Sequence, residues 1–151
     1  MSSINQTPVN QVASQQLQYF INLSQMQAVV SRRFDHMGSM VGFTDFMVLY
    51  HLSQADGQKM RRIDLAEKMG MTASGVTRVL LPMEKLRLVG RESNPRDGRV
   101  SMARLTSGGR RILEESMERA ETIATDLIAP TDIENIPVLM RVNEDIRRAA
   151  L

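Results

Sequence analysis

The segment Arg61–Thr106 constrains the fold more than any other part of this 151-residue chain. A small residue, Ala66, precedes Gly70 by four positions, and an apolar pair, Val76 and Val79, follows that glycine at six and nine positions. A small residue lets two helices approach, and a glycine gives a tight turn its backbone freedom. The apolar pair would then form the buried face of a second helix. The spacing predicts a helix-turn-helix, with an ordinary helical hairpin as the alternative.

The second helix of this motif is predicted to follow Thr72, its N-cap, and to end near Leu86. Its predicted buried face consists of Val76, Val79, Met83 and Leu86. The residues left on the opposite face are Ser74, Thr77, Arg78 and Leu81. Hydroxyls and an arginine near a helix N-terminus suit the base edges and phosphates of a major groove. We therefore expect Thr72, Ser74, Thr77 and Arg78 to bind DNA; the alternative is that the hydroxyls are simply solvated.

A β-hairpin, or wing, is predicted after this helix. Its strands are Leu88–Arg91 and Val100–Leu105, and the turn between them is crowded with Pro, Gly and Asp. Arg96 and Arg99 lie near the tip, where basic side chains can enter a minor groove. Asp97 is expected to hold the Arg99 guanidinium in a bidentate pair. A solvated turn is the alternative for the hairpin tip.

The flanking segments are predicted to be helical because their apolar residues recur at steps of three and four. The predicted helices span residues 12–36, 45–54 and 107–129, with a last helix starting near residue 131. Thr44 and Thr106 are predicted N-caps. Thr131 and Glu134 form a capping-box pattern for the last helix, in which Pro137 is expected to make a kink.

These elements predict one mainly α-helical fold with a small β-hairpin. The first helix carries more apolar surface than one small core can cover, so a second copy of the chain is expected to cover the excess. The predicted organisation is a flexible N-terminus at 1–10, an N-terminal dimerisation helix at 11–40, a winged helix-turn-helix at 41–106 and C-terminal dimerisation helices at 107–151.

Positive charge is concentrated in the helix-turn-helix and the wing. Residues 58–99 carry ten basic and five acidic side chains, whereas the whole chain has a net charge of only +2. Such a concentration is expected where phosphates are neutralised. A chance excess on a solvated face is the alternative explanation.

The composition argues against other classes of protein. The chain has no cysteine, which excludes disulfides and thiolate metal sites. Its first fifteen residues do not resemble a signal peptide, no apolar run is long enough to span a membrane, and we expect a cytoplasmic location. His36 and His51, the only histidines, lie on separate predicted helices without clustered acidic residues. We therefore predict no metal, no cofactor, no catalytic residues and no enzymatic activity.

The chain resembles the MarR family of winged-helix transcriptional regulators. The residues that carry the resemblance are Asp64–Ala66, Ser74–Arg78, Leu86–Arg91, Asp97–Arg99 and Leu105–Thr106. The resemblance implies a homodimer that binds double-stranded DNA at a pseudo-palindromic operator, usually as a repressor. It also implies release of DNA by a small aromatic or anionic ligand bound between the dimerisation and DNA-binding parts. Arg87 departs from the family, which usually has glycine at this turn, so the turn is expected to close differently.

Two points stay open at the level of sequence. A winged-helix module that contacts protein and has lost DNA binding is the alternative function, although it would have no reason to keep Arg78, Arg96 and Arg99. If a ligand pocket exists, we expect it near Phe34, His51 and the helix after the wing.

Overall fold

A computed structural model describes residues 12–36, 41–94 and 96–150. Its elements are α1 (Gln15–Asp35), α2 (Phe43–Ser53), η1 (Asp56–Gln58), β1 (Lys59–Arg61), α3 (Arg62–Met69), α4 (Ala73–Lys85), β2 (Val89–Ser93), β3 (Ser101–Leu105), α5 (Ser107–Leu127), η2 (Pro130–Asn135) and α6 (Ile136–Ala149). The predicted fold class, mainly helical with a small antiparallel β-structure and a winged helix-turn-helix, is confirmed. The segment 1–10, expected to be flexible, lies outside the described residues.

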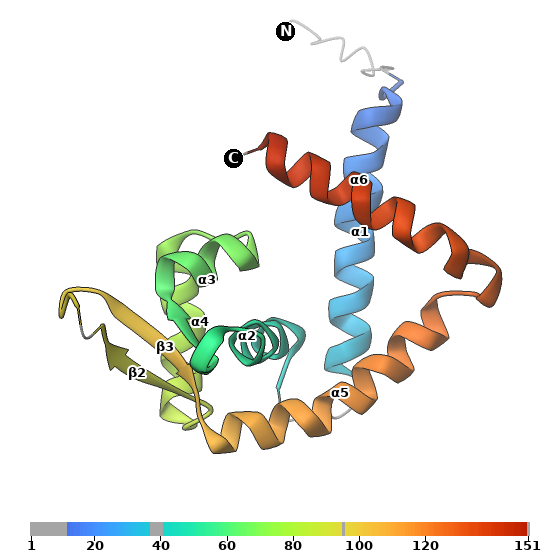
Figure 1. The fold of residues 1–151 in the computed structure, drawn as a ribbon. Helices are drawn as coiled ribbons and strands as arrows, with labels where there is room; N and C mark the ends of the chain where they lie inside the picture. Colours follow the sequence, from blue (N-terminus) through green and yellow to red (C-terminus); the bar gives the residue numbers. More distant parts are fainter. Residues whose placement is uncertain (1–11, 37–40, 95, 151) are drawn as a thin grey trace, which may run out of the picture.

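The helix-turn-helix and the wing lie together, away from the terminal helices. Figure 1 shows α3, α4 and the β2–β3 hairpin at one end of the molecule and α1 with α6 at the other. Helix α5 runs between these two parts (Figure 1). The position of α5 therefore sets the position of the terminal helices relative to the wing.

The sheet has three antiparallel strands in the order β1-β3-β2, so the prediction of two strands is wrong. The missing strand, β1, has only three residues and pairs with β3, with Met60 opposite Ala103. The ammonium group of Lys59 donates to Glu92 Oε1 at 2.7 Å and ties β1 to β2. A strand this short has no alternation to detect, and its stability comes from partners far along the chain.

The core is built around α2 and the inner face of α4. Leu49 and Leu52 of α2 are fully buried in one apolar cluster with Val76, Leu80 and Met83 of α4. Val79, predicted to lie on the buried face of this helix, is only half-buried. The prediction that Leu86 extends this face is wrong, since its side chain is 66% exposed. Helix α4 ends at Lys85, and the chain turns away before Leu86 can follow the helical stripe.

The turn of the helix-turn-helix forms as the sequence predicts. Gly70 ends α3 in the left-handed conformation, with φ 61° and ψ 32°, which glycine adopts without a steric penalty. The N–H group of Met71 donates to Ala66 O at 2.9 Å. Thr72 then caps α4, its Oγ1 accepting from Gly75 N at 3.1 Å.

The turn after α4 closes through a residue in the left-handed conformation. Arg87 has a φ of 58°, the left-handed conformation that a glycine would adopt here. The N–H groups of Arg87 and Leu88 donate to Glu84 O and Met83 O, each at 3.0 Å. The arginine thus closes the turn in a conformation that favours glycine. The arginine adopts a conformation that costs an L-residue about 1–2 kcal/mol.

Arg87→Gly is therefore expected to raise the free energy of unfolding by about 0.5–1 kcal/mol, because the relief of strain exceeds the extra entropy of glycine in the unfolded chain. Urea unfolding followed by circular dichroism measures the difference. Lys85→Gly is the control: it lies in the last turn of α4, and glycine there should destabilise by about 0.5–1 kcal/mol. A loss of stability in both variants would argue against strain at Arg87.

Two predicted helix starts need correction. Thr131 lies within η2 rather than at an N-cap, and α6 begins later, at Ile136. Pro137 consequently occupies the first turn of α6, where its missing N–H group breaks no helical bond, so there is no reason for the predicted kink. Thr44 lies inside α2, whose N-cap is Gly42, with no side-chain capping bond.

Helices α1 and α6 expose large apolar side chains. Leu17, Phe20, Val138 and Leu139 are between 48% and 51% exposed. The hydroxyl group of Tyr19 on α1 donates to the Asn143 side chain on α6, so the two helices lie close together at this point. Within the described part of the chain, no helix combines the length and apolar character that a bilayer crossing requires.

Candidate DNA-binding surface and ligand cavity

The outer face of α4 carries the residues predicted to read DNA. Ser74 and Arg78 are exposed, one helical turn apart and opposite the buried stripe of α4. Leu81, on the same side, is 45% exposed. Thr72 is exposed, and its Oγ1 lies 3.2 Å from Ser74 Oγ. The structure thus places Thr72, Ser74 and Arg78 on one accessible surface.

Thr77 differs from its neighbours on α4. Its side chain is half-buried, and its Oγ1 donates to Ala73 O at 3.1 Å. The same oxygen lies 3.5 Å from Arg62 Nη1. Because its hydroxyl already has partners inside the protein, Thr77 is less available for a base edge than Ser74 is.

The tip of the wing is organised by two side chains that bond to the backbone. Asn94 Oδ1 accepts from Arg96 N at 2.9 Å, and Asp97 Oδ1 accepts from Arg99 N at 3.0 Å. The prediction that Asp97 holds the Arg99 guanidinium is therefore wrong. The carboxylate binds the backbone N–H two residues on, as Asp commonly does in turns. It fixes the course of the chain and leaves the Arg99 side chain exposed.

Several other cations of this region are held in ion pairs that the sequence analysis missed. Glu84 Oε1 binds Arg62 Nη2 at 2.6 Å, and Glu84 Oε2 binds Arg91 Nη2 at 3.3 Å. Glu92 binds Lys59, and this hydrogen bond holds the pKa of the carboxyl below its usual value. In contrast, within the described residues Arg78, Arg96 and Arg99 have no acidic partner. Their charge remains available to an external anion.

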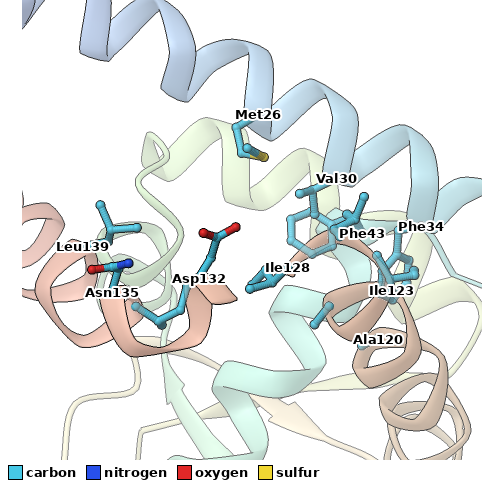
Figure 2. A pocket seen from close by; sticks show the side chains of 13 residues that line it. Met26, Val30, Phe34, Phe43, Ala120, Ile123, Ile128, Asp132, Asn135 and Leu139 are labelled. Atoms are coloured by element: carbon cyan, nitrogen blue, oxygen red, sulfur yellow. The ribbon is translucent and has the colours of Figure 1, made fainter. Parts of the chain in front are cut away.

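A cavity of about 600 Å³ lies between α1, α5 and the segment around η2. Its lining is mostly apolar, and Figure 2 shows side chains of α1, α2, α5, η2 and α6 around it. Phe34, predicted to lie near a ligand pocket, is part of this lining, whereas His51 is not. Among the residues the structure describes, no three histidine or acidic side chains gather where a metal ion could bind.

His51 lies apart from this cavity, on α2. Its ring packs edge-on against Tyr50, with centroids 5.7 Å apart, and Nε2 has no hydrogen-bond partner among the described residues. Burial, followed by the nearby charge of Lys68, lowers the pKa of this imidazole. The neutral ring is therefore favoured, as is common for a histidine held against a protein core.

The comparisons with known proteins agree with this architecture. Residues 43–101 match the model of the MarR family. An uncharacterised HTH-type transcriptional regulator, YdgJ of Bacillus subtilis strain 168, is 30% identical over 103 residues, which is 66% of this chain. The match covers 60% of the length of that curated relative.

Solved structures share the fold over most of the chain. Sco3205 of Streptomyces coelicolor, a MarR family transcriptional regulator solved in complex with DNA, superposes with a TM-score of 0.72 and 18% identity. The match covers 89% of this chain and 92% of that one. BpsR of Bordetella bronchiseptica, whose DNA binding is regulated by 6-hydroxynicotinic acid, superposes with a TM-score of 0.74 and 21% identity. That match covers 89% of this chain and 99% of BpsR. Residues 43–101 thus carry the winged helix-turn-helix of the MarR family, and most of the chain has the fold of MarR family transcriptional regulators of known structure.

Proposed function

We propose that this protein is a sequence-specific regulator that binds double-stranded DNA as a homodimer and represses transcription. The observation that carries the proposal is the contrast among the cations of the winged helix-turn-helix. Arg62 and Arg91 share an ion pair with Glu84, whereas Arg78, Arg96 and Arg99 are exposed without acidic partners among the described residues. Unpaired arginines on a helix and a wing suit phosphates and base edges.

Thr72, Ser74, Thr77 and Arg78 would contact the major groove, and Arg96 and Arg99 would reach the adjacent minor groove. Asp97 contributes indirectly, by fixing the backbone from which Arg99 extends. Thr77, whose hydroxyl is already bonded, contributes mainly by its position. The exposed Leu81 could pack on a thymine methyl group in the same groove.

The terminal helices support the homodimer. Adjacent, half-exposed apolar side chains on α1 and α6 form a surface of the kind that soluble monomers rarely leave uncovered. In this proposal α1, α5 and α6 hold two winged domains on a pseudo-palindromic operator, with half-sites about 10 bp apart. A small ligand with an aromatic body would bind in the cavity between α1, α5 and η2 and release the DNA.

Arg99→Ala is expected to weaken operator binding by about tenfold or more, because base or groove contacts of this kind are typically worth 1–3 kcal/mol. The measurement is fluorescence anisotropy with a duplex from the region upstream of the protein's own gene, at several salt concentrations. Arg141→Ala is the matched control, since it removes the same charge from α6.

An unchanged affinity of the Arg99→Ala protein at matched salt would contradict the role given to the wing. Failure of the unmodified protein to bind any such duplex at low salt would favour a winged-helix module that contacts protein instead. A footprint with a single half-site would contradict the dimer.

A further inference from the structure

We propose that the cavity between α1, α5 and η2 binds a small hydrophobic cation, such as an amine with an aromatic body, rather than an acid. This inference rests on the proposed role of the cavity as the ligand site of a regulator. It concerns the charge of the ligand, which the apolar lining alone does not determine.

The charge of the cavity comes from one side chain. Asp132 is the only ionisable residue in the described lining, and Asn135 is the only other with a polar side chain group. The remaining lining residues are apolar and include Met26, Phe34, Phe43 and Ile128. No lysine, arginine or histidine is among these residues, so the lining offers a carboxylate and no cation.

Asp132 and Asn135 are exposed and lie at the open side of the cavity, where the Asp132 carboxylate points across the opening. Figure 2 shows the Asp132 side chain directed from η2 toward Met26, with Asn135 beside it. The aromatic side chains lie at the opposite end, where the rings of Phe34 and Phe43 are 5.4 Å apart. A ligand with an apolar body against these rings would therefore place a polar head near Asp132.

Asp132 is not neutralised from within the protein. Among the described residues it has no ion pair, and its backbone N–H group donates only to Ala129 O, within η2. The basic residues of α1, Arg32 and Arg33, line a separate hollow with Val29 and His36. Arg33 is in addition paired with Asp126 of α5, at 3.7 Å.

This arrangement discriminates between ligands by charge. An acid entering the cavity would lose hydration, find no cation and meet the negative charge of Asp132. An ammonium group would pair with the same carboxylate and could donate to the Asn135 oxygen. A cavity of about 600 Å³ accommodates a body of two aromatic rings.

The test uses three biphenyl compounds that differ in one group: 4-phenylbenzylamine, 4-phenylbenzyl alcohol and 4-biphenylcarboxylate. Their dissociation constants are measured calorimetrically at pH 7.5 with the full chain. We expect the amine to bind about fivefold or more tightly than either of the others, as a partly solvated ion pair would give. Asp132→Asn should remove this preference and leave alcohol binding within about twofold.

Two further variants locate the effect. Glu134→Gln, a neutralisation in the same short helix outside the lining, should leave the preference for the amine intact. Ile128→Trp should fill the cavity and abolish binding of all three compounds. Tighter binding of the carboxylate, an unchanged preference in Asp132→Asn, amine binding by Ile128→Trp, or no binding of any compound would each overturn the inference.

Operator binding of the ligand-free proteins separates this inference from the proposed function. Glu134→Gln should bind operator DNA as the unmodified protein does, because Glu134 lies outside the cavity lining and η2 follows the end of α5 that is far from the wing (Figure 1). If the protein bound operator DNA but bound the carboxylate more tightly than the amine, only the inference about the charge of the ligand would be overturned. Absence of operator binding would overturn the proposed function itself.

Discussion

Replacing Gly109 with alanine is expected to lower the free energy of unfolding by roughly 3 kcal/mol, the upper part of the range for overpacking a protein interior. Gly109 lies in the first turn of α5. A Cβ atom there would lie 2.0 Å from Leu88 O and 2.9 Å from Leu105 Cδ1. The first contact is with backbone, so a change of side-chain rotamer cannot relieve it.

The neighbouring hydrogen bonds make a backbone shift costly. Leu88 O accepts from Thr106 Oγ1 at 2.9 Å and from Thr106 N at 3.3 Å. Thr106 Oγ1 in turn accepts from Gly109 N at 3.0 Å. Moving the start of α5 away from Leu88 would strain this set of bonds, which connects the wing to the helix leading to the terminal region.

The adjacent Gly108 provides the control. A Cβ atom at Gly108 would meet Arg87 O at 3.4 Å, close to ordinary van der Waals contact. Gly108→Ala should therefore change stability by no more than about 0.5 kcal/mol, with a gain possible from the better helix propensity of alanine. Urea unfolding of both variants measures their free energies of unfolding. Equal effects of the two substitutions would contradict the close approach at Gly109.

The elements that the sequence predicted well depend on local chemistry. Gly70 ends α3 because glycine adopts positive φ readily, and Thr72 and Thr106 cap α4 and α5 because their hydroxyls reach the N–H three residues on. These signals lie within a few residues of the feature they specify. The helix-turn-helix and the start of α5 could therefore be predicted from the sequence.

The features that the sequence analysis missed depend on partners distant in the chain. Strand β1 exists because β3 pairs with it, and Glu84 of α4 has its partners on α3 and β2. The cavity gathers side chains from α1, α2, α5, η2 and α6, so its single carboxylate could not be identified from one segment. Phe34, at the end of α1, lines the cavity as expected, whereas His51 lies outside the lining and packs against Tyr50.

The second large effect is expected for Glu84→Gln, which should reduce the free energy of unfolding by about 2 kcal/mol. The side chains of Arg62 and Glu84 are 17% and 22% exposed, so their pairing is only partly screened by water. Removing the carboxylate charge leaves the Arg62 guanidinium confined between α3 and α4 without its counterion. The loss of stability is limited because the glutamine side-chain oxygen can still accept a hydrogen bond from Arg62.

Glu115→Gln is the matched control for this substitution. Glu115 pairs with Arg111 at 3.7 Å, and the two side chains are 55% and 70% exposed. Exposed pairs of this kind contribute about 0–1 kcal/mol, so the control should be close to neutral. Similar losses in both variants would mean that the position of Glu84 between α3 and α4 has no special energetic role.

A double-mutant cycle with Arg62→Met separates the pair from other effects. If the cost of Glu84→Gln arises from an uncompensated guanidinium, it should fall by about 1 kcal/mol or more when Arg62 is already replaced. Additive losses would contradict this cause.

Because Arg62 Nη1 also approaches Thr77 Oγ1 at 3.5 Å, the same pair holds the outer face of α4 in place. The Glu84→Gln protein should consequently bind operator DNA more weakly than its residual stability alone would predict.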